Sequence, residues 1–408
     1  MSSSLTGISF QSAAIFSFVK EIGRGGMGIV YLAEKHSEDV SDLVVLKTIL
    51  TTRDQQLDSL KREANIAATL RHENIVRTFG LESIPFDSLP TEFKDNLSVF
   101  IHKESFEKTR GSEHTTNIRM GLTCAEEDSD NRKLLGRGKD NAGKRLFLIV
   151  MEYIDGWDLR KIHSKHIKAG LLLPVKFNAF IISRICRALE YAHQYIVHRD
   201  ISPENILVND QGVTKLMDFG LSVAADQETF ELAGKIQYMA PEQVLDGYVD
   251  NRSDIFSLGL VAYRLLTGIS PFFPPSGMNF QQQTEYYGKM LDKEIVPPHE
   301  ICVDVPEEYS QIVMKMLAVD SSMRYQKIDK VGREIEKKFI YAEGFGPTNN
   351  SLAAYLKLFD LDFQVYDDED LEQLAFMTDD NDEFVFKRKL QKELYTERGR
   401  QIMKDRRG

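Results

Sequence analysis

A glycine cluster near the start of the chain has a pattern that could bind phosphate groups. It reads Gly23-Arg24-Gly25-Gly26-Met27-Gly28 and is followed by the strand-like residues Ile29-Val30-Tyr31. On its own, this pattern also describes a tight hairpin. A dinucleotide-binding fingerprint needs a helix to begin at its third glycine. A strand at that place instead favours a glycine-rich flap over phosphates, because absent side chains let backbone amides approach the anion.

Two charged residues beyond the cluster could complete a phosphate site. Lys47 lies in an apolar, strand-like stretch, where a lysine without a partner is rare. Glu63 lies on the following helix, predicted from Leu57 to Leu70 by its apolar spacing, and is a candidate partner. The alternatives are an edge lysine that reaches water and a carboxylate that faces solvent.

Three later stretches, read together with the glycine cluster, carry a family resemblance. They are His198-Arg199-Asp200-Ile201-Ser202-Pro203-Glu204-Asn205-Ile206-Leu207, Met217-Asp218-Phe219-Gly220 and Met239-Ala240-Pro241-Glu242. In this order and spacing the chain resembles the protein kinase family, specifically the eukaryotic-like (Hanks-type) Ser/Thr kinases of bacteria. The matching motifs run from about Phe18 to Phe339, and so many fixed residue types in order make coincidence negligible.

The resemblance implies a role for each polar residue, and the chemistry of phosphoryl transfer agrees with it. Asp200 would accept the proton of a substrate hydroxyl or orient that hydroxyl. Asn205 and Asp218 would supply the hard oxygen ligands that Mg²⁺ prefers. Lys47 would contact the α- and β-phosphates of ATP, held in place by Glu63. The implied cofactors are therefore ATP and Mg²⁺, with Mn²⁺ as an alternative metal.

The resemblance also implies where the nucleotide lies. Its phosphates would lie under Gly23, Gly25, Gly26 and Gly28. The adenine would hydrogen-bond to the backbone of a hinge near Glu152 to Ile154, with Met151 at the gatekeeper position. The apolar faces around it would come from Val30, Val45 and Leu207. Val45 departs from the alanine that is usual in the family, which predicts a slightly tighter slot.

Other family positions are expected to be structural. Asp254 matches a helix aspartate that braces the catalytic loop, and Glu242 and Arg324 match an ion pair that anchors the activation segment. His198 and Phe219 match members of an apolar spine. Trp157, the only tryptophan, is expected to pack and to take no part in the chemistry.

Two departures from the family pattern are expected to compensate for each other. Ser202 stands where Ser/Thr kinases usually carry a lysine that contacts the γ-phosphate, and Lys235 stands where they usually carry a threonine. We hypothesise that Lys235 restores the missing charge near Asp200; the alternative is an exposed Lys235 and a weak site. Thr229 lies where a regulatory phosphate would fall, and Arg199 is the expected partner of that phosphate.

Composition limits the kinds of partner. The chain has 408 residues, a formal net charge of −11 and only 3 cysteines. This balance disfavours nucleic acid and anionic membranes, and the scattered cysteines predict neither a disulfide framework nor a CxxC metal site. There is no secretory signal pattern at Met1 to Ser9 and no apolar run long enough to span a bilayer, so we expect no membrane insertion and a cytoplasmic location.

The expected architecture is an α+β, bilobed protein-kinase-like fold. Its small N-lobe would be a mainly antiparallel sheet with one regulatory helix, and its larger C-lobe would be helical. Strands are expected, among others, at Asn74 to Glu82 and Arg145 to Ile154, and helices at Phe177 to Gln194, Ser253 to Leu266 and Glu307 to Leu317. The expected divisions are an N-terminal extension (1–17), a kinase domain (18–340, with lobes of about 18–152 and 153–340), an insertion (about 84–143) and a charged tail (341–408).

The insertion and the tail have open roles. A connection as long as 84–143 usually means a functional loop or a solvated segment, and the alternative is a docking element with its own helices. In the tail, Asp360 to Glu383 is acidic and Lys387 to Arg407 is mainly basic, so these blocks could pair with each other or fold over the domain. Ser351 to Phe359 resembles a short amphipathic helix that could dock. Either segment could bind a partner.

The sequence therefore predicts an ATP-dependent Ser/Thr protein kinase that phosphorylates itself and other proteins on Ser or Thr. Glu204, next to the catalytic loop, would favour a basic residue near the acceptor. The alternative from another class is a pseudokinase, catalytically weak or inactive, that acts as a nucleotide-binding scaffold. A missing Lys47, Asp200, Asn205 or Asp218 would favour that alternative, but all four are present.

Overall fold

The computed structural model describes two compact units. The first comprises Met1–Leu57 and Thr78–Tyr153, and the second Asp58–Arg77 and Ile154–Gly408. The residues described are 9–12, 14–25, 28–37, 40–49, 54–94, 145–219, 236–245, 249–272, 274–275, 277–342, 346–357 and 394–405. The chain passes from one unit to the other between Tyr153 and Ile154, within the hinge expected from the sequence.

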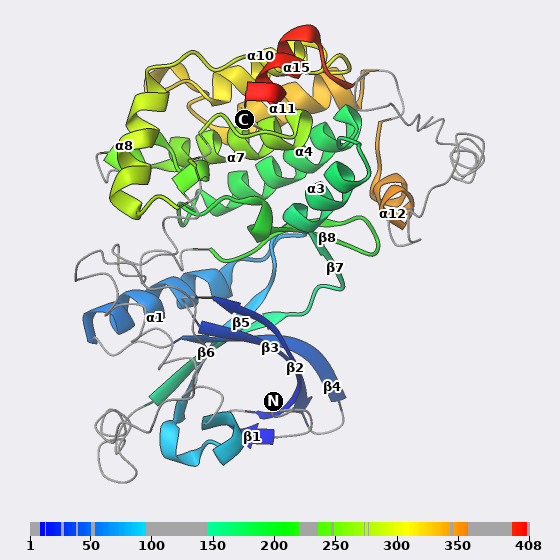
Figure 1. Cartoon of the computed structure of the whole chain (residues 1–408). Coiled ribbons are helices and arrows are strands. Elements are labelled where there is room, and N and C mark those ends of the chain that lie inside the picture. Colours follow the sequence, from blue (N-terminus) through cyan, green and yellow to red (C-terminus); the bar gives the residue numbers. More distant parts are fainter. Residues whose placement is uncertain are drawn as a thin grey trace, which may run out of the picture. The chain divides into compact units, whose positions relative to one another are not determined.

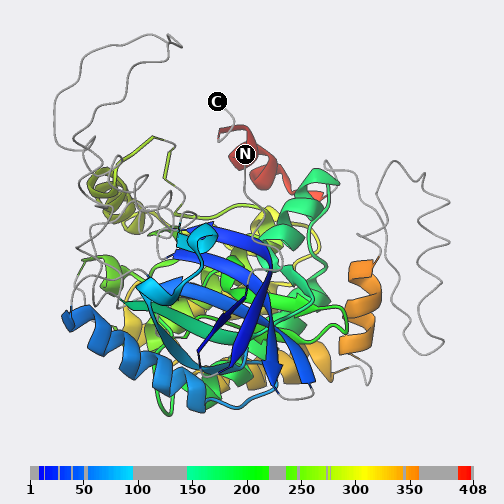
Figure 2. The same cartoon turned by 90° about the horizontal axis from the view of Figure 1, so that it is seen from below.

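The first unit is an antiparallel sheet that curls around an aromatic core (Figure 1). Phe18 stacks on Phe93 with ring centroids 4.5 Å apart, and its ring meets that of Tyr31 edge to face at 5.0 Å. Figure 2 looks onto these strands from below. The strand order is β1-β2-β3-β4-β6-β5, with β1 Ser9–Gln11, β2 Ile15–Gly25, β3 Gly28–Ser37, β4 Val40–Ile49, β5 Thr78–Pro85 and β6 Arg145–Glu152.

One expected strand begins later than the sequence predicts. The apolar pattern from Asn74 indicates a strand, but β5 begins only at Thr78. The residues before it belong to the second unit, where Ile75 forms a bridge with Leu216 and the Val76 amide donates to the Leu216 carbonyl at 2.8 Å. The β-branched residues Ile75 and Val76 thus pair with Leu216 of the second unit and not with the first sheet.

The second unit is built around a helix that is buried almost throughout, α7 (Asn251–Thr267). Asp250 caps its start by accepting from the Arg252 amide at 2.8 Å, and Gly268 ends it in the left-handed conformation, with φ of 76°. Among the helices described in this unit are α3 Leu159–Lys168, α4 Val175–Ala192, α6 Pro241–Leu245, α8 Phe280–Leu291, α9 Pro298–Ile301, α10 Glu307–Met316 and α11 Ile328–Ile335. Helix α1 (Asp54–Thr69) begins in the first unit and ends in the second.

A small sheet of the second unit carries the loops expected to be catalytic. It has the order β7-β8-β9, with β7 Gly156–Asp158, β8 Ile206–Asn209 and β9 Thr214–Leu216. The 3₁₀ turn η3 (Pro203–Asn205) leads directly into β8, and β9 leads into Asp218. Because β8 and β9 are neighbours in this sheet, it holds the segment that ends at Asn205 close to the segment that carries Asp218.

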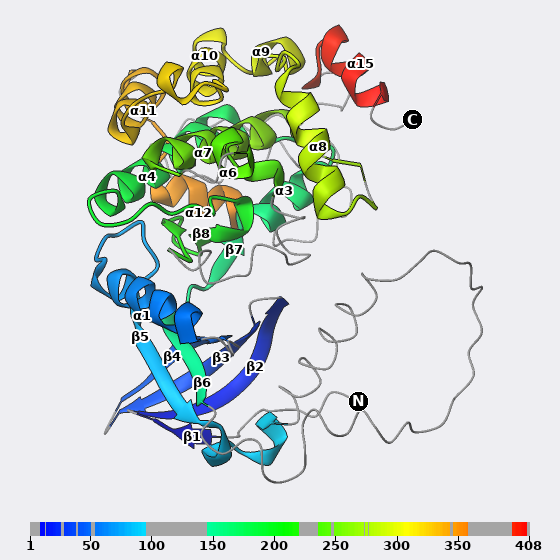
Figure 3. The ribbon, with the colours of Figure 1, turned by 90° about the vertical axis from the view of Figure 1, so that its left-hand side faces the viewer.

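Two pieces of the charged tail pack on the second unit. Helix α12 (Asn349–Lys357) buries Tyr355 against Phe177 of α4, with ring centroids 4.6 Å apart, which confirms the expected docking of this segment. Helix α15 (Glu397–Asp405) lies beside α9, as Figure 3 shows. Just before it, Tyr395 is buried and forms a bridge with Cys302. None of the helices in the described ranges is long and apolar enough to cross a bilayer.

Candidate active site

The register of the first sheet gathers four predicted nucleotide-binding residues on one face. Lys47 on β4 lies opposite Val30 on β3, and Val45 lies opposite Met151 on β6. Directly paired residues of antiparallel strands point to the same face, as do residues two apart. Val44 and Leu46, which alternate with Val45 and Lys47 along β4, belong to the aromatic core on the other face. The sheet therefore separates its core from a face that carries a lysine among apolar side chains.

The last glycine of the cluster is required by a close approach. Gly28 begins β3 with a φ of 141°, and a Cβ on it would lie 2.0 Å from the Thr48 carbonyl oxygen. Thr48 is fully buried, and its hydroxyl donates to the Ile29 carbonyl at 2.9 Å and accepts from the Ile29 amide at 2.7 Å. The start of β3 is thus fixed against the residue next to Lys47. Gly23 and Gly25 lie on β2, and Gly25 pairs with Gly28.

The second unit brings the predicted catalytic aspartate and one predicted metal ligand into direct contact. The Asn205 amide nitrogen donates to the Asp200 carboxylate at 3.0 Å and to the Asp200 carbonyl at 2.8 Å. The Met217 amide donates to the Asn205 carbonyl at 2.9 Å, which connects the segment before Asp218 to the same residue. Because its nitrogen is bonded to Asp200, the Asn205 side-chain oxygen points away from that aspartate.

The ring of His198 links the backbone at Asp200 to the backbone at Met217, and these two contacts define its tautomer. Its Nδ1 lies 3.2 Å from the Asp200 amide, which can only donate, so Nδ1 is the acceptor and carries no proton. Its Nε2 therefore bears the proton and donates to the Met217 carbonyl at 2.8 Å. Its ring meets that of Phe219, the other predicted spine residue, edge to face at 4.6 Å.

Asp254 braces the catalytic loop from beneath, as expected. Its carboxylate is 1% exposed and accepts from the His198 and Arg199 amides, each at 2.8 Å. His193 adds a contact that the sequence did not indicate, with its Nε2 2.9 Å from the same carboxylate. These bonds hold Arg199 at a φ of 68°, a conformation that is costly for a residue with a side chain.

A second unexpected contact holds Arg199 from the other side. The Gln243 amide nitrogen donates to the Arg199 carbonyl at 3.0 Å, and its side-chain oxygen accepts from the Ala240 amide at 3.0 Å. Asp218 is the only other non-glycine residue of the described ranges with a positive φ, at 64°. Backbone strain therefore concentrates at the two motifs that carry Asp200 and Asp218, as it does at many functional sites.

The comparisons with known proteins identify this arrangement. A model of the protein kinase domain matches residues 133–333, and a model of protein tyrosine and serine/threonine kinases matches residues 16–103. The kinase domain of PknI from Mycobacterium tuberculosis has the same fold, with a TM-score of 0.51 at 20% identity over 81% of this chain and 97% of that one. The chain belongs to the protein kinase family.

Curated bacterial kinases are similar over part of their length. Serine/threonine-protein kinase PrkC of Bacillus subtilis is 28% identical over 79% of this chain and 40% of its own. PknB of Mycolicibacterium smegmatis is 39% identical over 44% of this chain and 28% of its own. PknL of Mycobacterium tuberculosis is 35% identical over 51% of each. This chain thus spans about half or less of the length of these relatives.

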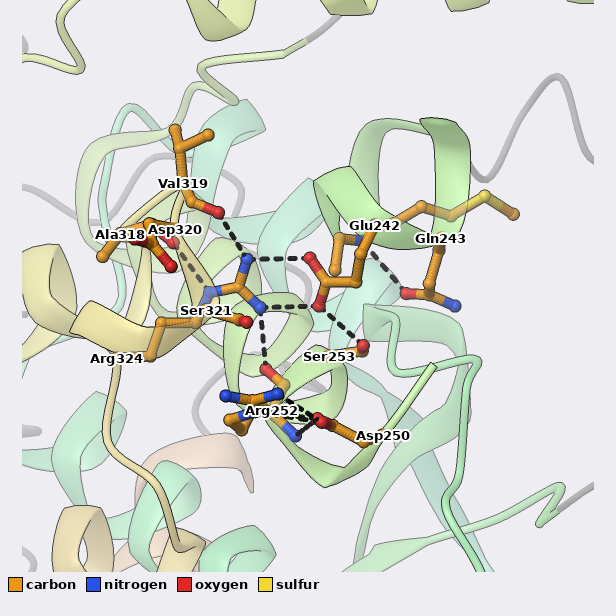
Figure 4. Close-up of polar contacts among 12 residues, drawn as sticks. Glu242, Gln243, Asp250, Arg252, Ser253, Ala318, Val319, Asp320, Ser321 and Arg324 are labelled. Carbon is orange, nitrogen blue, oxygen red and sulfur yellow. Dashed lines mark hydrogen bonds and ion pairs between the residues drawn. The ribbon is translucent and has the colours of Figure 1, made fainter. Parts of the chain in front are cut away.

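An ion pair anchors the segment Ala240-Pro241-Glu242, as predicted (Figure 4). Arg324 and Glu242 meet side by side, with nitrogen–oxygen distances of 2.7 and 2.9 Å. The other guanidinium donors go to the carbonyls of Ala318, Val319 and Arg252, so all five are used. Burial acts to raise the pKa of Glu242, but hydrogen bonds from Arg324 and Ser253 outweigh it and the pKa is lowered.

Ser202, the first departure from the kinase pattern, is buried. It is 1% exposed, and its hydroxyl oxygen has no hydrogen-bond partner within the described residues. A buried hydroxyl without a partner is costly.

Trp157 packs on the core of the second unit with Lys165 over its ring at 3.8 Å, which confirms the expected packing role.

Several predicted residues lie outside what the structure describes. These are Gly26, Thr229 and Lys235, together with the side chain of Glu63, although the backbone of Glu63 lies on α1 as expected. Glu152 ends β6, Ile154 opens the second unit and Leu207 lies on β8. The structure thus describes each half of the predicted site within its own unit.

The donor atoms of the second unit suit a divalent metal that is shared with phosphates. An amide oxygen from Asn205 and a carboxylate from Asp218 are hard ligands of the kind that Mg²⁺ prefers. No group of three or more His, Cys, Asp or Glu that could hold a metal occurs in the described ranges. Mg²⁺ usually keeps several waters and binds substrate phosphates together with one or two protein oxygens, so Asn205 and Asp218 suit it.

Proposed function

We propose that the chain is an ATP-dependent serine/threonine protein kinase that phosphorylates itself and other proteins. The observation that best supports this is the pair of hydrogen bonds from Asn205 to Asp200, with Asp218 attached to Asn205 through Met217. A hydroxyl-orienting carboxylate beside two hard oxygen ligands is what phosphoryl transfer requires. The names of the bacterial relatives support the choice of Ser and Thr as acceptors.

The residues of the second unit would orient the acceptor. The amide of Asn205 fixes the rotamer of Asp200 by bonding to both its side chain and its backbone. That carboxylate would accept the substrate hydroxyl's hydrogen and aim the hydroxyl oxygen at the phosphorus. His198 and Asp254 keep the loop in its strained form and would take no proton from the substrate.

The nucleotide would use residues of both units. ATP with Mg²⁺ supplies the transferable phosphoryl group and spreads its negative charge. Lys47 would hold the phosphates and Glu63 would hold Lys47, while Asn205 and Asp218 would hold the metal. Val30, Val45, Met151 and Leu207 would enclose the adenine, and the Glu152–Ile154 backbone would bond to it. We assign residues 18–340 to the kinase domain, with 84–143 as an insertion and 341–408 as a tail, either of which could bind a partner.

We propose that Lys235 supplies the charge lost at Ser202. Ser202 is buried and carries no charge, so a positive charge at the γ-phosphate would have to come from another residue. Lys235→Ala should then lose most activity, and Ser202→Lys in that background should restore some of it. Full activity in Lys235→Ala would contradict the exchange.

We also propose a cytoplasmic location, which the free buried thiols Cys186 and Cys302 suit.

The mass of the intact protein after incubation with Mg²⁺ and ATP tests the activity. Phosphate increments in the wild type and none in Asp200→Asn would establish catalysis, and mapping of the sites would show whether Thr229 is modified. Full activity in Thr229→Ala would show that this phosphate is dispensable. No increment in the wild type, with generic protein substrates also unmodified, would favour the nucleotide-binding scaffold.

A further inference from the structure

Gln243 joins two segments that are far apart in the chain. It lies on the short helix α6, directly after Glu242 (Figure 4). Its side-chain oxygen accepts from the Ala240 amide at 3.0 Å, and its side-chain nitrogen donates to the Arg199 carbonyl at 3.0 Å. One side chain thus connects α6 to the residue immediately before Asp200.

The two ends of the Gln243 side-chain amide have different roles. Ala240 precedes the first residue of α6, so the bond from its backbone amide to a side chain three residues later is one half of a capping box. Glutamate serves equally well at that position. The bond from the side-chain nitrogen to the Arg199 carbonyl lies outside the helix, and glutamate cannot form it because an ionised carboxylate only accepts.

Gln243 completes the restraint on one peptide unit. The carbonyl of Arg199 and the amide of Asp200 belong to the same planar group. Gln243 binds the carbonyl, and the amide donates to His198 Nδ1 at 3.2 Å. Because a trans peptide is rigid, contacts at both ends fix its orientation and therefore the direction in which the chain enters Asp200.

The preceding peptide unit is held separately, on the other side of the strained dihedral angle. Its N–H, which belongs to Arg199, donates to the buried Asp254 carboxylate at 2.8 Å. The φ of 68° at Arg199 is the rotation between these two held units. A positive φ is costly for a residue with a side chain, so it persists only where both units are restrained. Asp254 restrains one unit, and Gln243 together with His198 restrains the other.

We propose that Gln243 is a positioning residue for phosphoryl transfer. The inference rests on the proposed kinase activity. Gln243 touches no substrate, but it fixes the peptide unit between Arg199 and Asp200 against α6 and so sets the place of the Asp200 carboxylate. Helix α6 is itself anchored by the bonds between Glu242 and Arg324. The geometry at Asp200 therefore depends on the segment that carries Glu242.

Gln243→Glu separates positioning from capping. It keeps the size of the side chain and the acceptor for Ala240 but removes the donor to Arg199. With Mg²⁺, ATP and either casein or the chain itself as acceptor, kcat and the single-turnover rate should fall by about five- to tenfold, the range that the loss of one hydrogen bond allows. The KM for ATP should stay within about twofold, because the change acts on the transition state and not on nucleotide binding.

Hydrogen exchange supplies a readout that does not depend on catalysis. The backbone amides of Arg199 and Asp200 both donate to side chains that hold the loop. Their exchange should be several-fold faster in Gln243→Glu, because the loop opens more often when one restraint is lost. A residue that only caps α6 would leave this exchange unchanged in the variant that keeps the cap.

Two further variants separate the outcomes. Gln243→Met loses both hydrogen bonds at similar size, so it should match Gln243→Glu in rate and be less stable. Gln326→Glu removes a side-chain donor from the carbonyls of Ser321, Ser322 and Arg324, none of which belongs to the catalytic loop, so it should keep the wild-type rate and exchange.

The outcomes for Gln243→Glu decide the inference. Wild-type rate and wild-type exchange in this variant, with a loss only in Gln243→Met, would overturn the positioning role and leave the proposed function standing. A raised KM for ATP with unchanged kcat would overturn it in the same way. No phosphate transfer by the wild type to casein or to itself would overturn both the inference and the proposed function.

Discussion

The carboxylate of Asp254 accepts from the backbone amide of Arg199 at 2.8 Å while Arg199 has a φ of 68°. A fully buried acceptor on α7 thus stabilises a costly backbone conformation immediately before Asp200, the proposed catalytic residue. The same carboxylate also binds the amide of His198 and the ring of His193. The shape of the catalytic loop therefore depends on one side chain that touches no substrate.

Asp254→Asn should weaken the hydrogen bonds to the backbone of His198 and Arg199 without changing the volume of the side chain. Asn can offer one oxygen but must turn its amide hydrogens toward the other donors, so we expect a loss of about 1–3 kcal/mol of stability. We also expect a fall of about tenfold or more in kcat, because the strained loop relaxes. Chemical denaturation and initial-rate measurements check both.

Asp250→Asn is the matched control for that change. Asp250 caps the same helix, α7, but is more exposed, and asparagine caps helices equally well. The variant also loses the ion pair with Arg252, which is partly exposed, so stability should change by less than about 1 kcal/mol, and kcat should be unchanged. A loss of the same size at both positions would show that α7 and not the loop accounts for the effect.

The Arg324–Glu242 pair gives a second prediction about stability. Arg324→Ala leaves a partly buried carboxylate without its partner, and three backbone carbonyls lose their donor, so we expect a loss of about 3–5 kcal/mol. Because the pKa of Glu242 is lowered in the folded protein, this contribution is complete above about pH 4.5. It is lost as the pH falls through the lowered value.

The exposed Arg333 provides the comparison for the ion pair. It pairs with Asp329 and Glu190 at 3.4 and 3.7 Å, but it is 68% exposed. Its replacement by alanine should cost less than about 1 kcal/mol. Thermal unfolding of both variants at pH 7 measures the difference, and equal effects would contradict the argument from burial.

The sequence predicted those contacts that follow from local motifs. Asp254, Glu242 and Arg324 occupy recognisable positions, and the bounds of helices α4, α7 and α10 lie within two residues of those predicted. The β5 start was wrong because apolar, β-branched residues indicate pairing but not the partner. Ile75 and Val76 pair with Leu216 in the second unit, a choice made by tertiary packing.

The remaining contacts depend on convergence over long distances in the chain. Nothing local marks Gln243 as a partner of Arg199 or His193 as a partner of Asp254. Arg264 did carry a signal, since a charged residue in an apolar helix needs a reason. Its partner Gln237, however, comes from another element, so their contact appears only once these elements are packed.

A buried histidine gives a prediction about pH. Helix α3 orients His166 by a hydrogen bond from its Nδ1 to the Ile162 carbonyl at 2.7 Å, so Nε2 is the acceptor of the Tyr355 hydroxyl at 2.6 Å. Burial lowers the pKa of His166 to about 4. Between about pH 6.5 and 4 the unfolded chain binds a proton that the folded protein does not. Stability is therefore complete above pH 6.5 and falls toward pH 4.

Two variants isolate this effect. His166→Gln keeps an acceptor for Tyr355 but cannot titrate, so its stability should fall less steeply, by up to about 1.4 kcal/mol per pH unit. Tyr355→Phe should lose about 1 kcal/mol at pH 7 and keep the wild-type pH slope. Urea denaturation at several pH values measures the slopes. An unchanged slope in His166→Gln would assign the dependence to other groups, such as His163.

The last prediction concerns the tail as a stabilising element and not as a gate. Helix α12 buries Leu352, Tyr355 and Leu356 on the second unit, and its first residue lies so close to Gly212 that a Cβ there would be 1.8 Å from the Asn349 carbonyl oxygen. Each such side chain contributes roughly 1.5–3 kcal/mol when buried. Deletion of 341–408 should therefore destabilise the kinase by several kcal/mol, with kcat falling or unchanged at a temperature where the shortened chain is folded.

A chain that ends after Lys357 separates the two parts of the tail. It keeps α12 and removes the charged blocks and α15, so it should regain most of the stability lost by the full deletion. It should still lose the contribution of Tyr395, which is buried beside Cys302. Thermal unfolding and kinase assays of the three chains decide the role of the tail. An increase in kcat on deletion would show instead that the tail restrains activity, and it would contradict a purely stabilising role for α12.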